Sequence, residues 1–247
     1  MGFRAVAWAV ALLLWSSPAL AQLSRHRPRH AAAAVARPPK AGFKRVPQTY
    51  VVNLPARKDR LAQVTRELAA VGVSNFSVTP GIVHQCGALG CSLSHILTLQ
   101  KCVDSRARAC LVVEDDFELT VPPERAGSLL DQLLDVPGSE WDFVFLASRV
   151  VSAANSSFAF LDRVADAHTT SAYIVSGRYA PTLLDAFLRS AHLLNEHACD
   201  MEQYAIDMFM KRLQPVSRWY VFKPKLGKQR KSYSDVAFEE RDYGVRR

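Results

Sequence analysis

The chain has 247 residues, of which 49% are hydrophobic, and it carries 31 Lys or Arg against 23 Asp or Glu. This apolar fraction is that of an ordinary globular protein and excludes a chain that is disordered throughout. The net charge of +8 arises at the N-terminus, because residues 1–47 hold 8 basic and no acidic residues and the remainder holds 23 of each. The folded part is therefore neutral overall, and we expect no nucleic-acid partner.

The first 21 residues have the pattern of a secretory signal peptide. A charged start precedes the apolar run Ala5–Trp15, and small residues follow it up to a cleavage site predicted after Ala21. Eleven apolar residues are too few to cross a bilayer, which needs about 20. An uncleaved signal anchor stays the alternative, and a membrane is a partner only in that case. Either way, we expect the chain in the secretory lumen (endoplasmic reticulum or Golgi) or secreted.

Residues 22–47 are basic and rich in Pro and Ala, which predicts a disordered stem before a domain at residues 48–247. The five cysteines favour some disulfide pairing in this compartment, and the odd number leaves at least one free or bonded to another chain. Two glycosylation sequons, at Asn75 and Asn155, agree with a secretory route.

From residue 48 onward, strand-like and helix-like patterns alternate. Strands are predicted at residues 49–54, 75–79, 109–113, 141–148, 170–176 and 218–224, and helices at residues 57–71, 88–103, 122–134, 178–194 and 200–213. This alternation predicts a single α/β domain with a mostly parallel sheet and helices on both faces.

The second predicted helix has Leu89, Leu93, Ile96 and Leu97 on its expected apolar face, with His95 off that face.

Three adjacent carboxylates, Glu114, Asp115 and Asp116, follow the apolar strand pattern "ACLVV". Ligands of such sheets bind beyond the C-terminal ends of the strands. In an extended chain Glu114 and Asp116 face the same way and Asp115 faces the opposite way. Adjacent carboxylates repel unless a cation holds them, and oxygen ligands suit Mn²⁺ or Mg²⁺. A metal site and a solvated acidic loop are both open at this point.

Four stretches together resemble glycosyltransferase family 25, which includes lipopolysaccharide-biosynthesis and collagen galactosyltransferases. They are "YVVNLPARKDR" (50–60), "GALGCSLSHI" (87–96), "LVVEDDF" (111–117) and "PKLGKQRKSYSDV" (224–236). The resemblance implies a GT-A-type nucleotide-sugar-binding fold, a UDP-sugar donor, Mn²⁺ (or Mg²⁺) and inversion at the anomeric carbon. It also implies transfer of a hexose, by family habit galactose, to a glycan or glycoprotein hydroxyl.

A non-catalytic lumenal binding module on the same fold is the alternative, because fold does not fix function. A metal phosphohydrolase would also need clustered carboxylates, but its usual His-rich ligand set is not present in this sequence.

The resemblance also assigns roles to residues. Asp116 is the expected direct metal ligand, and Glu114 or Asp115 is expected to reach the ion or the ribose through water. The residues expected to bind the donor are Asn53, Arg57, Arg60, Ser94, His95, Asp115 and Thr169. The basic segment 223–231 is expected to order over the diphosphate when UDP and metal bind.

An inverting transfer needs a base, and the family pattern implies Asp200 as this base or as a second metal contact. Asp200 and Gln203 also have capping-box spacing, so Asp200 as a helix cap is the alternative. Asp207 is a second match to the same family position.

Overall fold

A computed structural model describes residues 42–234 and 239–241. The chain divides into two units, Met1–Pro38 and Pro39–Arg247, and every described residue belongs to the second unit. The expected signal peptide and the stem up to residue 41 lie outside the described residues. Within the described ranges no helix has both the length and the apolar character needed to cross a bilayer.

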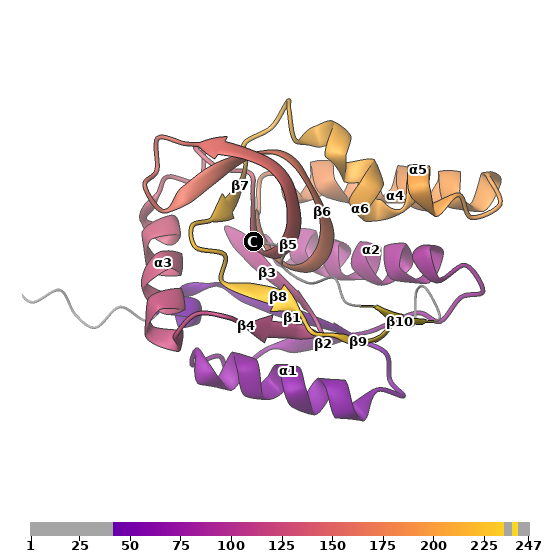
Figure 1. Cartoon of the computed structure of the whole chain (residues 1–247), viewed down its shortest axis with the longest axis horizontal. Coiled ribbons are helices and arrows are strands. Elements are labelled where there is room, and N and C mark those ends of the chain that lie inside the picture. The colour runs from indigo at the N-terminus through magenta and orange to yellow at the C-terminus, as the bar shows by residue number, and fades with distance from the viewer. Residues whose placement is uncertain (1–41, 235–238, 242–247) are drawn as a thin grey trace, which may run out of the picture. The chain divides into compact units, whose positions relative to one another are not determined.

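A six-stranded sheet with the strand order β2-β1-β3-β6-β5-β7 forms the centre of the domain (Figure 1). Its strands are β1 (Gln48–Asn53), β2 (Ser77–Pro80), β3 (Ala109–Glu114), β5 (Phe143–Asn155), β6 (Leu161–Ser176) and β7 (Trp219–Phe222). The β1–β2, β1–β3 and β5–β7 pairs are parallel, and β6 runs antiparallel to its neighbours. The predicted mostly parallel α/β sheet is confirmed.

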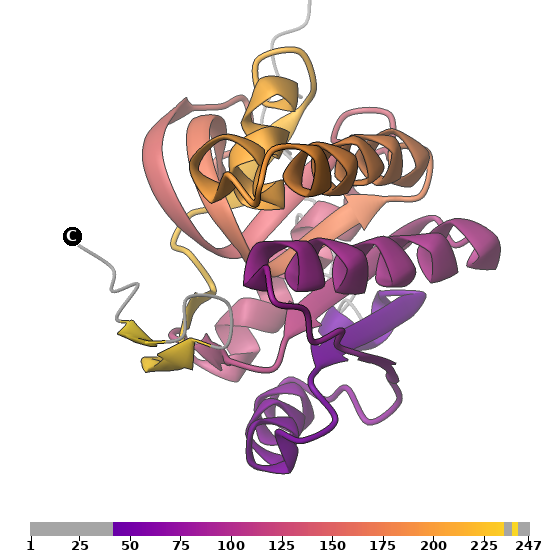
Figure 2. The same ribbon diagram turned by 90° about the vertical axis from the view of Figure 1, so that its right-hand side faces the viewer.

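Helices cover both faces of this sheet. One face carries α1 (Lys58–Ala70), α3 (Pro123–Asp135) and the 3-10 helix η1 (Gly42–Arg45), and the other carries α2 (Gly87–Ser105), α4 (Ala180–Glu196) and α6 (Ile206–Phe209). Figure 2 shows α2 and α4 side by side. In β3, Leu111 and Val113 belong to the first core while Cys110 and Val112 belong to the second. This alternation follows from the two-residue period of a strand.

The folded domain begins earlier than the predicted boundary at residue 48. Phe43 and Val46 are 2% and 8% exposed and pack into the core that contains α3. The backbone N–H of Gly42 donates to Asp131 Oδ2 at 3.1 Å, and Arg45 Nη1 donates to Asp131 Oδ1 at 2.7 Å. Residues 42–47 therefore belong to the domain rather than to the stem, because two apolar side chains and a buried carboxylate hold them.

The hairpin of β5 and β6 extends well beyond the two short strands that the sequence predicts. It contains several register shifts, and it curves so far that Leu161 of β6 pairs with Phe222 of β7 (Figure 1). The added part of β5, residues 149–155, mixes apolar and polar side chains, and nearly all of them are exposed. A strand with no buried face shows no alternation, so its sequence carries no strand signal.

The buried face of α2 differs from the predicted one. His95 is fully buried and Leu97 is 45% exposed. The buried hydroxyls of Ser92 and Thr98 donate to the backbone carbonyls four residues earlier, at 2.8 and 2.9 Å. Because these internal bonds satisfy its polar groups, α2 can turn a polar face toward the sheet.

The predicted helix at 200–213 is broken into three short pieces. These are α5 (Met201–Tyr204), α6 and the 3-10 helix η2 (Met210–Leu213). Ala205 separates α5 from α6 with an extended ψ of 144°. Two small antiparallel pairs complete the fold: β4 (Phe117–Leu119) with β8 (Gly227–Gln229), and β9 (Ser232–Ser234) with β10 (Glu239–Arg241).

Two disulfides connect α2 to other segments. Cys86 bonds Cys199, and Cys102 bonds Cys110, which leaves Cys91 as the free cysteine. This outcome agrees with the expectation that some of the five cysteines pair and that one is left over.

Candidate functional site

The three carboxylates lie where β3 ends. Glu114 is the last residue of the strand, and Asp115 and Asp116 form the turn into β4; residues 114–116 are called the acidic turn below. Asp115 and Asp116 are each only 6% exposed. The solvated-loop interpretation is therefore wrong, since buried carboxylates must be paired, protonated or bound to a cation.

Asp115 is held by residues of β1 and α1. Asn53 Nδ2 donates to Asp115 Oδ2 at 2.7 Å, and Arg60 Nη1 lies 3.3 Å from Asp115 Oδ1. The Asp115 backbone N–H donates to Val52 O at 3.1 Å. Burial raises the pKa of Asp115, while the bonds from Asn53 and Arg60 oppose that rise. Protein donors contact both carboxylate oxygens of Asp115, and one of these donors is the cationic Arg60, so the charge of Asp115 is partly compensated within the protein.

Asp116 is less well compensated. Gln229 Nε2 of β8 donates to Asp116 Oδ2 at 3.0 Å, and Ser171 Oγ lies 3.4 Å from Oδ1. Arg60 Nη1 is 4.0 Å away and is shared with Asp115. Burial, with added repulsion from Glu114 and Asp115, raises the pKa of Asp116 to about 7. One arginine is thus shared by two carboxylates beside a third, and a divalent cation would relieve this excess of negative charge.

Glu114 points toward α2 and β6. Thr170 Oγ1 donates to Glu114 Oε1 at 2.6 Å, and His95 Nε2 lies 3.1 Å from the same oxygen. The other ring nitrogen of His95 lies 3.1 Å from the Tyr173 hydroxyl, so both nitrogens have partners. The Glu114 side chain is 20% exposed and open to a ligand.

The contacts of the three carboxylates group Glu114 with Asp116, and the roles assigned to these residues stay predictions. Glu114 and Asp116 both contact β6, at Thr170 and Ser171, whereas Asp115 contacts the β1 side. Strand alternation does not cause this grouping, because Asp115 and Asp116 lie in a turn and not in an extended chain.

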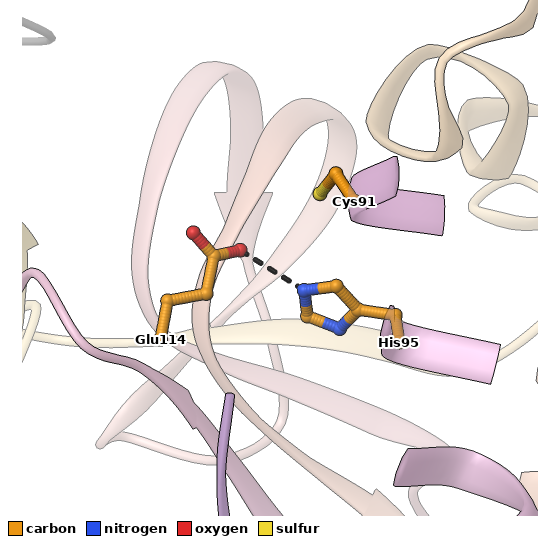
Figure 3. Close-up of side chains that lie close together, drawn as sticks. All are labelled: Cys91, His95 and Glu114. Atoms are coloured by element: carbon orange, nitrogen blue, oxygen red, sulfur yellow. Dashed lines mark hydrogen bonds and ion pairs between the residues drawn. The ribbon is translucent and has the colours of Figure 1, made fainter. Parts of the chain in front are cut away.

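Cys91 joins His95 and Glu114 in a cluster that the sequence analysis missed. One ligand atom from each residue lies within 4.8 Å of the other two (Figure 3). Burial raises the pKa of the Cys91 thiol well above its usual value, and nearby carboxylates add to this. The four-residue spacing of Cys91 and His95, which places both on one helix face, was the available signal.

Another carboxylate, Asp207, is linked to the acidic turn through β6. Thr169 has a positive φ of 71°, and its backbone N–H donates to Asp207 Oδ2 at 3.2 Å. His168 Nδ1 lies 3.6 Å from the same oxygen. Since the next residue, Thr170, bonds Glu114, residues 168–170 connect Asp207 to the acidic turn.

Asp200 is the N-cap of α5, where its Oδ1 accepts the backbone N–H of Gln203 at 3.2 Å. The capping interpretation is confirmed, and the role of Asp200 as the base stays a prediction.

Two of the expected donor-binding side chains are engaged elsewhere. Ser94 Oγ donates to Gly90 O at 2.7 Å and accepts the Ile82 N–H at 2.8 Å, so it fastens a loop to α2. Arg57 forms an ion pair with Asp59 at 3.2 Å. The structure brings Asn53, Arg60, His95, Asp115 and Thr169 to the acidic turn or to the network that touches it.

Residues 227–229 of the basic segment 223–231, which was expected to order over a ligand, already pair with β4 as β8. The backbone N–H of Arg230 donates to the backbone carbonyl of Asp116 at 2.7 Å. The Arg230 side chain is also paired, with Nη2 at 2.8 Å from Glu67 Oε1. A Cβ at Gly227 would lie 2.2 Å from the Phe117 ring and 2.7 Å from Glu118 O. Glycine is therefore required where β8 packs on β4.

Comparison with models of protein families identifies a family for this chain. A model described as glycosyltransferase family 25 (LPS biosynthesis protein) matches residues 85–210. Among solved structures, 56 chains match. One is a glycosyltransferase involved in glycosylation of the major capsid of PBCV-1, with 12% identity, a TM-score of 0.45, and coverage of 74% of this chain and 93% of that one. Another is mannose-1-phosphate geranyltransferase from Thermus thermophilus, with 11% identity, a TM-score of 0.42, and coverage of 76% of this chain and 60% of that one. No curated protein matches the chain.

Proposed function

We propose, from the premise that the chain belongs to glycosyltransferase family 25, that it is a metal-dependent inverting hexosyltransferase of GT-A type. The donor is a UDP-sugar, with galactose as the first candidate, and the acceptor is a hydroxyl of a glycan or glycoprotein. The observation that carries the proposal is the buried acidic turn at the C-terminal end of β3, where α/β sheets bind their ligands.

Asp116 and Glu114 would hold the divalent ion. Both present carboxylate oxygens, which are ligands that Mn²⁺ and Mg²⁺ prefer. The raised pKa of Asp116 supports this choice, because the structure leaves negative charge there that a cation would neutralise. Held by these two carboxylates, a divalent ion would neutralise charge on the diphosphate leaving group. Thr170 and His95 fix the Glu114 carboxylate, and Asn53 and Arg60 fix the turn through Asp115.

We place the base at Asp207. Its carboxylate accepts the Thr169 N–H, its side chain is 26% exposed, and it lies on the β6 network that reaches Glu114. In an inverting transfer the base takes the acceptor hydroxyl proton while the acceptor oxygen bonds the anomeric carbon and the bond to the UDP oxygen breaks. Asp200 is the second candidate by family position, although it caps α5.

We place the protein in the secretory lumen (endoplasmic reticulum or Golgi) or outside the cell. The two disulfides support this compartment, because cytosolic thiols are kept reduced. Both sequon asparagines, Asn75 and Asn155, are exposed and open to glycosylation. A glycosidase-sensitive mass shift that is lost in an Asn75→Gln, Asn155→Gln variant would test the assignment.

The decisive experiment is a UDP-sugar panel with Mn²⁺, followed by mass spectrometry of a labelled acceptor library. We expect Mn²⁺-dependent UDP release, a glycosylated acceptor and loss of both in Asp116→Asn. The matched control is Asp185→Asn, which neutralises an exposed aspartate on α4 that pairs with Arg189. Binding of UDP and Mn²⁺ without transfer would favour the lumenal binding module, and no UDP binding at all would refute the donor assignment.

A further inference from the structure

The Cys91, His95 and Glu114 cluster differs in chemistry from the rest of the acidic turn. It combines sulfur, imidazole nitrogen and carboxylate oxygen, whereas Asp115 and Asp116 offer oxygen alone. Thiolate and imidazole select zinc-like ions over the hard ions that oxygen ligands prefer. Three protein ligands of this kind with an open fourth position are a frequent zinc arrangement.

The geometry fits such an ion with little movement. A tetrahedral zinc with bonds of about 2.0–2.3 Å separates its ligand atoms by roughly 3.3–3.6 Å. His95 Nε2 and Glu114 Oε1 are already 3.1 Å apart, and all three ligand atoms lie within 4.8 Å of one another. Figure 3 shows the three side chains converging, two from α2 and one from the end of β3. The Cys91 Sγ would have to come closer to the other two atoms to complete the set.

The surroundings of His95 also suit a metal ligand. The His95 ring is fully buried, and its Nδ1 lies 3.1 Å from the Tyr173 hydroxyl. The His95 ring also stacks on the Tyr173 ring. A ligating histidine usually donates its second N–H to such a partner, which fixes the ring and the tautomer. The Tyr173 hydroxyl can accept a hydrogen bond from Nδ1–H. In that tautomer the lone pair of Nε2 is free to bind a metal ion on the side of Cys91 and Glu114.

Redox or nucleophilic chemistry explains Cys91 less well. Burial raises the pKa of its thiol, and a reactive cysteine needs the opposite shift. Cys91 forms no disulfide, although the other four cysteines do. A metal is the ligand that turns a buried thiol into a thiolate, with the proton released to solvent.

We propose that Cys91, His95 and Glu114 form a zinc site that shares Glu114 with the catalytic ion site. Zinc bound there draws Glu114 away from Asp116 and weakens Mn²⁺ binding, so zinc inhibits the transfer. The inhibitory consequence rests on the proposed function, whereas zinc binding itself does not.

The test uses cobalt as a spectroscopic stand-in for zinc on the purified protein with its disulfides intact. We expect a thiolate-to-cobalt charge-transfer band in the wild type, its loss in Cys91→Ser and Cys91→Ala, and its displacement by zinc. Direct zinc titration should show affinity reduced roughly tenfold or more in both variants. His192→Asn, which changes an exposed histidine on α4, is the control for adventitious binding and should keep the band. Absence of the band in wild type, or its persistence in a folded Cys91 variant, overturns the proposal.

A second arm measures Mn²⁺ binding by electron paramagnetic resonance, which needs no enzymatic turnover. Zinc should lower Mn²⁺ affinity in the wild type and not in Cys91→Ser. An equal effect of zinc in both proteins would place zinc on the carboxylates alone and overturn the shared site. Failure of sugar transfer in every sample would refute the proposed function while leaving the cobalt result to decide the zinc site.

Discussion

Replacing Asp116 with Asn should stabilise the metal-free protein at pH 8 and at the same time remove metal-dependent activity. Asp116 is 6% exposed and lies beside Glu114 and Asp115, and these conditions raise its pKa to about 7. Asn has nearly the same shape, and its oxygen can still accept the Gln229 bond that Asp116 Oδ2 accepts at 3.0 Å. The substitution therefore removes a disfavoured charge without leaving a cavity.

The size and sign follow from proton linkage. The pKa of Asp116 rises from 3.8 to about 7. Each tenfold change in proton affinity corresponds to about 1.4 kcal/mol, so the charged carboxylate lowers the free energy of unfolding by at most about 4 kcal/mol. The folded protein keeps this proton up to about pH 7, while the unfolded chain loses it near pH 4. The contribution of Asp116 to stability therefore falls as pH rises from about 4 to about 7 and is constant above that.

Chemical denaturation of both proteins in EDTA, from pH 4 to pH 8, measures the difference directly. The variant should gain about 1–4 kcal/mol over the wild type at pH 8, and the gain should shrink toward zero near pH 4. Mn²⁺ should raise the midpoint of the wild type alone, because ligands stabilise only the state that binds them. A variant that is less stable than wild type at pH 8 in EDTA would refute the reasoning.

Further predictions concern the other carboxylates and the long disulfide. Asp207→Asn should lower transfer by roughly 10²–10⁴-fold in a turnover assay while calorimetry shows unchanged binding of UDP and Mn²⁺; unchanged turnover would exclude it as the base. Asp200→Ala should cost about 1 kcal/mol of unfolding free energy and Asp200→Asn almost none, with turnover per folded molecule unchanged in both; a large catalytic loss would return the base to Asp200. Removing the Cys86–Cys199 bond by double serine substitution should cost about 2–5 kcal/mol in a denaturation curve, and a change below that range would mean that the packing of α2 already fixes this contact.

The class of the fold could be predicted because its signal is local. The helix α1 begins and ends close to its predicted bounds, and Gly72 follows it with a φ of 82°, a conformation that commonly ends helices at glycine. β3 is buried on both faces, so its sequence is an apolar run that leads directly into the acidic turn. Each of these features depends on neighbours in the sequence, and for that reason the alternation of strands and helices was sufficient.

The extended hairpin and the buried face of α2 could not be predicted, because both depend on distant partners. Exposed residues of β5 are held in a strand by pairing with β6, and β6 in turn pairs with β7. Helical periodicity predicts His95 on the surface. In the structure it is buried, because Tyr173 and Glu114 supply hydrogen-bond partners for its two ring nitrogens. No local pattern contains this information.

The choice between Asp200 and Asp207 has the same origin. Capping-box spacing is local, and it correctly predicted that Asp200 caps α5. The contacts of Asp207 with His168 and Thr169 join residues nearly forty positions apart and require the positive φ of Thr169. A sequence comparison could name both aspartates, and only the packing of α6 against β6 distinguishes their surroundings.

The four stretches that resemble the family are separate in the sequence, yet they meet at the acidic turn. Asn53 and Arg60 come from the first stretch, His95 from the second and Gln229 from the fourth, and each contacts a carboxylate of the third. The burial of like charges explains this convergence. Each carboxylate at the end of β3 needs a hydrogen-bond donor or a cation that offsets the free-energy cost of burying it. The motifs are therefore parts of one electrostatic unit. Substitutions in different stretches should show coupled rather than additive effects on Mn²⁺ binding, since they act on the same small set of charges.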